Sequence, residues 1–510
     1  MSGSRVQKGD VPGPFAPLLR ALTEEALSGR LRACVPGHGG GAYAPPLLSA
    51  ALARHGALLL DLTELPGLDD LAHPTGAIAE AESRTAEALG AAGAAFLVNG
   101  SSVGLHAVFL AFAHEGSRVA LETGSHRSTY AALALSGARP VLLCEREDPT
   151  TGYSLGPDPS QAEIILRERP DLVCLTYPTY QGTAWDLRPW IEISHRAGAL
   201  VVVDSAHGAH FGLDPRLPPP ALSLGADGAV LGFHKSLGSL TQTAVVAWRR
   251  TSFGERLRPM LRLLQTSSPS YLLLASLDAA QASLSDPAQG AARWKEAVDR
   301  ALSLRSHWPG TIWDPSGAGV RVDPTRVTLL AGVDGSGSRL AEALWHLGVA
   351  SEYADARGVL AIVGPGLGPE DVACLEKALK RVPRGLLRLP APGGGTAAHA
   401  CAPDPDPVSA GMPPDRARRF DRSMLSALRS PAQWVPLSEA AGFRSADFVA
   451  PYPPGIPWIL PGERVGTEVL LALVERWRAG AEVHGITKEG TMKVIHEGSQ
   501  DIEATAGVHA

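Results

Sequence analysis

Lys235 is the side chain in this sequence best placed for amine chemistry. It follows the apolar run 228–232 directly, inside the segment Phe233-His-Lys-Ser-Leu-Gly238. A lysine at the end of a buried strand loses solvation, which lowers its pKa toward the value that an amine needs to attack an aldehyde. The ordinary alternative is a loop lysine that keeps its ammonium group in water. The position therefore favours a lysine that forms a Schiff base.

Asp204 is the second candidate, because it ends the apolar run 200–204 and precedes His207 and His210. A carboxylate at this place could pair with the protonated pyridine nitrogen of an electron-sink cofactor. The same three side chains could instead bind zinc or iron. No cysteine or acidic residue nearby in the sequence completes such a set, so we expect no metal but keep the alternative open.

Two further segments suit a flat, phosphate-bearing ligand. Gly100-Ser-Ser102 stands between the apolar run 94–98 and a helical pattern at 103–113. Hydroxyls and free N–H groups at a helix N-terminus form an anion site, although a plain serine N-cap has the same sequence. His126 follows another apolar run after a short loop and is placed to stack on a ring.

The elements that must position these residues are short apolar runs separated by helical patterns. The runs are residues 94–98, 118–121, 140–143, 171–176, 199–203 and 228–232, all expected to be buried strands. Such alternation predicts an α/β fold with a parallel sheet covered on both faces. Ligands of these sheets bind at the carboxyl ends of the strands, where the candidates lie.

The remaining sequence divides by composition. At 510 residues the chain is long enough for two or three domains. We expect an N-terminal segment at 1–60, a large domain at 61–285, a small α+β domain at 286–388, a Pro/Gly/Ala-rich linker at 389–415, a C-terminal domain at 416–487 and a polar tail at 488–510.

Composition excludes several classes of function. A net charge of −6 provides no basic footprint for nucleic acid. The longest apolar runs are too short to span a membrane, and the N-terminal residues lack the pattern of a signal peptide. Five scattered cysteines without a CxxC pair fit a reducing compartment. We therefore expect a cytoplasmic enzyme or binding protein with a small-molecule ligand.

A series of motifs runs through most of the chain, apart from the linker and the termini. They are Pro36-Gly-His38, Asp61-Leu-Thr-Glu-Leu-Pro-Gly-Leu-Asp-Asp70, His73-Pro-Thr-Gly76, Phe96-Leu-Val-Asn-Gly-Ser-Ser102, Ser125-His-Arg-Ser128, Thr176-Tyr-Pro-Thr-Tyr-Gln-Gly182, Asp204-Ser-Ala-His-Gly208, His234-Lys235, Thr266-Ser-Ser-Pro-Ser-Tyr271, Pro451-Tyr-Pro-Pro-Gly-Ile-Pro457 and Pro461-Gly-Glu463. In this order they resemble the short form of the ornithine/lysine/arginine decarboxylase family. The resemblance implies a fold type I large domain with a mainly parallel seven-stranded sheet, and pyridoxal 5'-phosphate (PLP) as the cofactor.

The resemblance also implies a role for each candidate around the cofactor ring. Lys235 would hold PLP, and Asp204 would pair with the pyridine nitrogen. His126 would stack on one ring face, with Ala206 packed on the other. His207 would lie near the substrate carboxylate.

Other implied roles concern the phosphate, the substrate and the assembly. Ser101, Ser102 and His234 would hold the phosphate, joined by Thr266 from a partner subunit. Family members share sites between subunits, so we expect at least a homodimer. The tentative residues for the cationic end of the substrate are Glu64, Asp70 and Glu463, with Asp69 a further candidate.

The implied reaction is decarboxylation of a basic L-amino acid, and we expect arginine before lysine or ornithine. Three departures from the family pattern bear on it: Gly39, Ser205 and Gly232-Phe233. The last removes a phosphate hydroxyl and would bring an aromatic ring into the site. Two alternatives therefore stay open. One is a PLP enzyme of specialised metabolism that performs transamination, aldol-type cleavage or elimination, and the other is a non-catalytic regulatory homologue.

Overall fold

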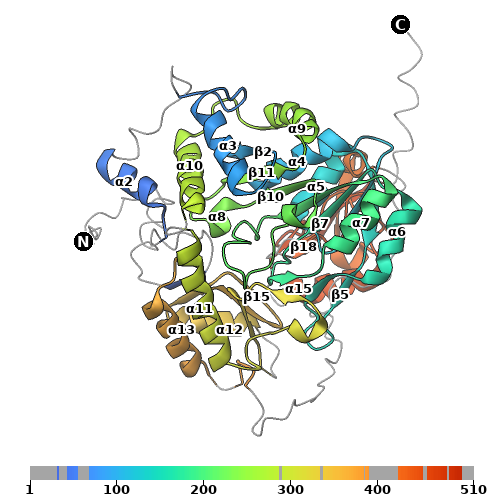
Figure 1. Ribbon diagram of the computed structural model, residues 1–510. Coiled ribbons are helices and arrows are strands. Elements are labelled where there is room, and N and C mark those ends of the chain that lie inside the picture. The colour runs from blue at the N-terminus through green and yellow to red at the C-terminus, as the bar shows by residue number, and fades with distance from the viewer. Residues whose placement is uncertain are drawn as a thin grey trace, which may run out of the picture.

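The computed structural model describes residues 31–33, 43–55, 68–286, 290–332, 337–383, 385–389, 423–451, 456–478 and 482–496. Figure 1 shows a large domain above, with a small domain below it that contains α11 (Ala291–His307), α12 (Gly337–His346) and α13 (Pro369–Arg381). The C-terminal domain, in orange and red, packs against the large domain. The motif residues Pro36–His38 and Gly39 lie outside the described residues.

The large domain is built on one seven-stranded sheet. In spatial order its strands are β2 (Gly93–Leu97), β11 (Ala244–Trp248), β10 (Gly228–Leu231), β9 (Leu200–Ser205), β7 (Leu172–Thr176), β3 (Arg118–Glu122) and β4 (Arg139–Leu143). Only β11 runs antiparallel to its neighbours within this sheet. The expected α/β fold with a mainly parallel sheet is confirmed.

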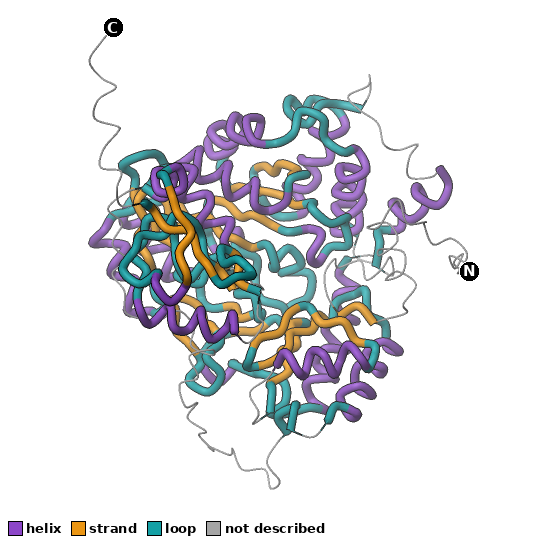
Figure 2. The backbone as a smooth tube through the Cα atoms, turned by 180° about the vertical axis from the view of Figure 1, so that it is seen from behind, coloured by secondary structure: helices purple, strands orange, loops and turns teal. Residues whose placement is uncertain are grey.

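Both faces of the sheet are covered, which explains the uninterrupted apolar strands. Along β9, Val202 packs on one face, whereas Val201 and Val203 pack on the other. The first face is covered by α4 (Gly100–Phe112), α5 (Arg127–Ser136) and α9 (Thr251–Leu264). The second face is covered by α6 (Ala162–Glu168) and α7 (Arg188–Ala197) at one side, and by α3 (Ala77–Ala88) and α10 (Tyr271–Ser285) at the other. Figure 2 shows this sheet from behind.

The small domain holds an antiparallel sheet of β13 (Arg326–Leu330), β16 (Gly358–Ile362) and β15 (Tyr353–Asp355). The strand β1 (Leu31–Ala33) pairs in parallel with β14 (Val349–Ser351), so part of the expected N-terminal segment belongs to this domain. The helix α2 (Pro46–His55) lies against α10. A hairpin of β5 (Glu145–Glu147) and β6 (Ser154–Pro157) extends from the large domain.

The C-terminal domain corrects one boundary of the sequence analysis. Its elements are α14 (Met424–Arg429), β17 (Ala432–Pro436), β18 (Ala450–Pro451), α15 (Thr467–Arg478), β19 (Val483–His484) and β20 (Thr491–Ile495). The strand β20 pairs with β17, so the expected polar tail from residue 488 is wrong for these residues. Met492 and Val494 alternate with polar neighbours and point into the domain core.

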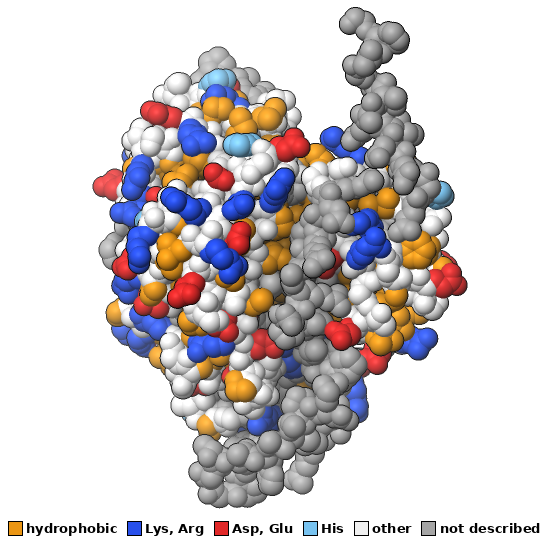
Figure 3. All heavy atoms as spheres, turned by 90° about the vertical axis from the view of Figure 1, so that its right-hand side faces the viewer, with side chains coloured by type: hydrophobic (Ala, Val, Ile, Leu, Met, Phe, Trp, Pro, Cys, Tyr) orange, Lys and Arg blue, Asp and Glu red, His pale blue; other side chains and the backbone are white. Residues whose placement is uncertain are grey.

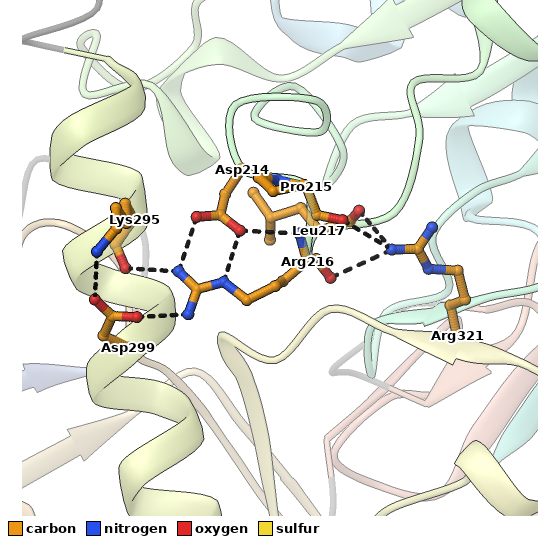
Figure 4. Close-up of polar contacts among 7 residues, drawn as sticks. All are labelled: Asp214, Pro215, Arg216, Leu217, Lys295, Asp299 and Arg321. Carbon is orange, nitrogen blue, oxygen red and sulfur yellow. Dashed lines mark hydrogen bonds and ion pairs between the residues drawn. The ribbon is translucent and has the colours of Figure 1, made fainter.

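The large and small domains meet through a short strand pair and a polar network. The strand β8 (Thr183–Ala184) pairs with β12 (Arg321–Val322). Figure 4 shows the network, which we call the outer junction and which comprises Asp214, Arg216, Lys295, Asp299 and Arg321. Arg216 forms a bidentate pair with Asp214 at 2.8 Å and also binds Asp299, which Lys295 reaches at 3.2 Å. Arg321 donates to the carbonyl oxygens of residues 215, 216 and 217.

The surface and the helix lengths bear on possible partners. Figure 3 shows positive and negative side chains interspersed on one face of the molecule. Among the described residues, none of the helices is both long enough and apolar enough to cross a membrane. That nucleic acid is not a partner remains a prediction.

Candidate active site

The candidate residues converge at one edge of the large sheet. The strands β2, β3, β7, β9 and β10 run in the same direction, so their carboxyl ends lie along one edge. In Figure 1 this edge is turned toward the small domain. This is the place where ligands of such sheets bind.

Lys235 lies in the short helix α8 (Phe233–Ser236), directly after β10. Its Nζ is 2.9 Å from Nε2 of His207. Burial lowers the pKa of Lys235, and Arg326 adds to this effect while Asp204 opposes it. Burial and the charge of Lys235 also hold the pKa of His207 well below its usual range. The two side chains thus form a contact between a buried histidine and a partly buried lysine, in which the charged forms are disfavoured.

Two buried acids stand beside this pair. Asp204 is 6% exposed, and its Oδ1 accepts the N–H of Ala206 at 3.1 Å. Burial raises its pKa, and the charge of Lys235 opposes the rise. Glu122, which the sequence analysis did not single out, ends β3 and is fully buried, with Oε1 accepting the N–H of Thr176. Burial raises the pKa of Glu122 well above its usual value, and Asp204 is among the acids that contribute.

His126 is oriented by the start of α5. Its Nδ1 accepts the N–H of Ser128 at 3.1 Å and lies 2.7 Å from the Ser128 hydroxyl. Desolvation by the surrounding protein and the charges of Lys235 and Arg127 lower the pKa of His126 to about 4, while part of the ring stays exposed. A neutral ring with an open surface suits stacking on a flat cofactor.

Gly232 gives Lys235 the space to reach the site. A Cβ at Gly232 would lie 2.5 Å from the carbonyl oxygen of Ala206 and 3.2 Å from Cδ of Lys235. The neighbouring Phe233 is 0% exposed and packs in the core with Leu231. The expectation that this ring intrudes on the site is therefore wrong, because the first residue of α8 points into the core.

The start of α4 fits a phosphate group. Ser101 Oγ is buried without a hydrogen-bond partner, and Ser102 lies in the same helical turn. An unpartnered hydroxyl at a helix N-terminus suits an anion. His234 is oriented by a bond from Nδ1 to the carbonyl oxygen of Thr243 at 2.7 Å. These residues fit the phosphate of PLP.

Thr266 is exposed, and its N–H lies 3.5 Å from Oδ1 of Asn99 at the start of α4. Thr266 thus lies near Ser101 of its own chain. Its contribution to the phosphate site of a partner subunit remains a prediction.

The tentative substrate residues either lie outside the described residues or make bonds within a local turn. Glu64 lies outside the described residues. Asp70 Oδ1 accepts the N–H of Ala72, and Glu463 Oε2 accepts the N–H of Leu460. Each of these bonds is local to a turn, so a substrate role for either residue remains a prediction.

Asp69, the neighbouring candidate, has a structural explanation. Its carboxylate accepts N–H groups at the start of α3, including those of Gly76, Ile78 and Ala79. Although burial acts to raise its pKa, these backbone bonds lower it to about 2.

His210, one of the three side chains of the metal alternative, has partners within the protein. Its Nε2 bonds Oδ2 of Asp323 at 2.9 Å, and its ring stacks on Trp294 at 4.1 Å. His207 is paired with Lys235 instead. The proposed set of Asp204, His207 and His210 does not form, because the two histidines have different partners. Within the described part of the chain, no cluster of three metal-ligating side chains was found.

Arg326, which the sequence analysis also missed, is buried beside His210 and Asp323. These three residues form what we call the inner junction. Arg326 begins β13 and is 1% exposed, with Nε 3.7 Å from Oδ2 of Asp323. Its Nε and Nη1 have no hydrogen-bond partner. A buried donor left unsatisfied costs about 1–3 kcal/mol. The sequence signal that could have identified Arg326 is an arginine at the start of an apolar strand.

Tyr180 connects the reacting pair to the small domain. Its ring meets the edge of the His207 ring at 5.0 Å and that of Tyr353 at 5.5 Å. Its hydroxyl donates to Oε1 of Glu352 at 2.9 Å. The small domain therefore closes one side of the site.

Comparison with known proteins adds family information to this geometry. Residues 16–314 match the family model "Orn/Lys/Arg decarboxylase, major domain", and residues 408–490 match the C-terminal domain of the same family. The arginine decarboxylase of Halalkalibacterium halodurans is 31% identical over 503 residues, covering 94% of this chain and 98% of that protein.

Two solved structures share the fold. Lysine decarboxylase A from Pseudomonas aeruginosa has a TM-score of 0.74 and 22% identity, covering 94% of this chain and 80% of that chain. A serine palmitoyltransferase from S. paucimobilis with bound PLP has a TM-score of 0.52 and 18% identity, covering 69% and 88%.

Proposed function

Since the chain belongs to the ornithine/lysine/arginine decarboxylase family, we propose that this amino-acid decarboxylase converts L-arginine to its amine and carbon dioxide. Decarboxylation of a basic amino acid follows from the family. Similarity to an arginine decarboxylase over nearly the full length supports arginine ahead of lysine and ornithine. The observation that carries the proposal is the partly buried contact of Lys235 Nζ with His207 beside Asp204.

PLP is the cofactor, and it supplies the electron sink for bond cleavage at Cα. Lys235 would hold its aldehyde carbon, and Asp204 would keep the pyridine nitrogen protonated. His126 would cover one face of the ring. Ser101 and His234 would bind the phosphate, because the first offers an unpartnered buried hydroxyl and the second is oriented by Thr243.

The chain's own groups manage the protons. With a lowered pKa, the Lys235 amine is available as a nucleophile without a large cost of deprotonation. His207 Nε2, at 2.9 Å, can take a proton from Nζ or return one. Either atom can therefore deliver the proton that replaces carbon dioxide at Cα.

Burial directs the reaction as well. Tyr180 and the small domain cover the side of the site beside His207 and would limit the access of water there. Because Asp204 is buried, water screens its carboxylate little, and the charge of the carboxylate acts strongly on a cation beside it.

We also expect the protein to act as at least a homodimer. Thr266 is exposed next to the start of α4, where a neighbouring subunit could approach the phosphate site. Light scattering of the purified holoenzyme tests this, and a monomer with full activity would refute it.

Mass spectrometry of products tests the function. Holoenzyme is incubated separately with arginine, lysine and ornithine, and Lys235→Ala serves as the control. We expect the amine of arginine to form fastest and only with the intact lysine. A product that retains its carboxylate would contradict the proposal and would favour transamination, aldol-type cleavage or elimination.

A further inference from the structure

Gln242 has a backbone conformation that glutamine rarely adopts. Its φ is 82°, in the left-handed region that favours glycine, and Thr243 closes a turn around it by donating its N–H to the carbonyl oxygen of Leu240 at 3.3 Å. Gln242 is exposed, so packing in a core does not impose this conformation. A strained conformation at a residue other than glycine persists only where surrounding contacts hold it, and such residues cluster at functional sites.

Two hydrogen bonds connect Gln242 to the turn between β2 and α4. Its side-chain Nε2 donates to the carbonyl oxygen of Val98 at 2.6 Å, and its own carbonyl oxygen accepts the N–H of Gly100 at 2.8 Å. Gly100 begins α4 and has a φ of +78°. Among the described contacts, Asn99, the N-cap of this helix, makes no side-chain capping bond. Gln242 therefore satisfies the first N–H of α4 and fixes the start of the helix.

The next residue, Thr243, holds another part of the proposed phosphate site. Its carbonyl oxygen lies 2.7 Å from Nδ1 of His234 and accepts the backbone N–H of His234 at 3.4 Å. Thr243 is 0% exposed, and its hydroxyl donates to the carbonyl oxygen of Leu240 at 2.6 Å. The adjacent carbonyl groups of Gln242 and Thr243 thus bind α4 on one side and α8 on the other.

The loop 240–243 therefore connects two elements that carry the phosphate ligands of the proposed function. Ser101 and Ser102 lie in the first turn of α4, and His234 precedes Lys235 in α8. These two elements are far apart in the sequence. A phosphate group that binds both of them requires a fixed distance between them, because hydrogen bonds weaken steeply when a donor is displaced from its acceptor.

We propose that Gln242 is a positioning residue for the cofactor phosphate, and that it holds the start of α4 at the distance from α8 that the phosphate requires. The proposal rests on the phosphate site of the proposed function. Glycine would adopt the backbone conformation of residue 242 without strain, but it has no side chain to donate to Val98. The amide group of Gln242, which links the end of β2 to the loop, thus explains why glutamine occupies a position that favours glycine.

The test compares two ligands that differ only in the phosphate group. PLP and pyridoxal, which lacks the phosphate, are each titrated into the cofactor-free full chain, and binding is measured from the change in ligand absorbance. We expect Gln242→Gly to weaken PLP about 10-fold and to leave pyridoxal within about twofold. A purely structural role would weaken both ligands alike. Equal weakening of the two ligands, or an unchanged affinity for PLP, would overturn the proposal.

Two further variants separate the amide group from the backbone conformation. Gln242→Asn tolerates the left-handed region, but its side chain is one methylene too short to reach Val98, so we expect the same selective loss for PLP. A normal affinity for PLP in this variant would contradict the proposal. Arg169, with a φ of 46°, ends α6 at the opposite edge of the sheet, and Arg169→Gly should change neither affinity. A selective loss for PLP in Arg169→Gly would also contradict the proposal.

The role of Gln242 and the decarboxylation of arginine fail separately. Affinity for PLP is measured without substrate, whereas decarboxylation is measured from product mass. A protein that does not decarboxylate arginine would overturn only the proposed reaction. Wild-type protein that binds pyridoxal as tightly as PLP would overturn the phosphate site and, with it, the role of Gln242.

Discussion

The outer and inner junctions join the same two domains with the same kinds of side chain, yet they differ in what they leave unpaired. In the outer junction, Arg216 binds two carboxylates and is 37% exposed. In the inner junction, Arg326 is 1% exposed and two of its donors have no acceptor. Figure 4 shows the contacts of Arg216 with the carboxylates of Asp214 and Asp299. The comparison teaches that similar side chains satisfy one another at the exposed junction, whereas burial leaves two donors of Arg326 without acceptors at the other.

The reacting pair of Lys235 and His207 should produce the largest effect. Lys235→Ala removes the amine at 2.9 Å from His207. We expect turnover to fall at least about a thousandfold, because no other described lysine lies at the edge of the sheet where the candidate residues converge. Steady-state assays of amine formation measure this, and substantial residual activity would defeat the assignment.

Breaking the inner junction should cost more stability than any change in the outer one. Asp323→Ala leaves Arg326 without a counter-charge and His210 without its partner. We expect the free energy of unfolding to fall by about 3–5 kcal/mol, as for a buried pair that loses one member. Denaturant unfolding checks this, and a loss below about 1 kcal/mol would show that the pair is not buried in solution.

A change of pH should affect the stability of the site, because burial keeps the site histidines neutral in the folded protein. Desolvation, with the charge of Lys235, lowers the pKa of His234 to about 4 despite its bond to Thr243. Between pH 7.5 and 5.0 the unfolded chain binds a proton at this histidine that the folded chain does not bind, so stability decreases as the pH falls.

Cofactor-free wild type should therefore lose about 1–2 kcal/mol more than His234→Gln over this pH range. Urea unfolding at both pH values measures the difference. Equal losses in the two proteins would mean that His234 is protonated in the folded state.

The outer junction should give the smallest effect. Arg216→Gln removes contacts to Asp214 and Asp299 in a largely solvated setting. We expect the free energy of unfolding to change by about 0–1 kcal/mol and kcat/KM to stay within about twofold. Denaturant unfolding and steady-state assays of amine formation measure these quantities. A loss of stability as large as that of Asp323→Ala would contradict the distinction between the two junctions.

Much of the large domain could be predicted because its signals are local. Six strands and the placement of Lys235 and Asp204 follow from apolar runs that end in a polar residue. The same signal marks Glu122 and the run 244–248, and both were missed. Likewise, the alternation of Met492 and Val494 could have revealed β20.

The inner junction could not be predicted in the same way. Arg326 meets Gly182, and Asp323 meets His210, only because β8 and β12, far apart in the sequence, pair between domains. Whether the N–H groups of an arginine find hydrogen-bond acceptors depends on residues distant in the sequence. A local sequence pattern does not identify these residues. Phe233 shows the same limit, since its position beside Lys235 in the sequence does not say that its ring points into the core.

The most direct test of the reacting centre is borohydride reduction of the holoenzyme followed by peptide mapping. Reduction fixes the cofactor to the lysine that holds it. We predict the pyridoxyl group on the peptide that contains Lys235, and no labelled lysine in Lys235→Ala. Labelling of another lysine, such as Lys295 at the outer junction, would contradict the assignment of the site.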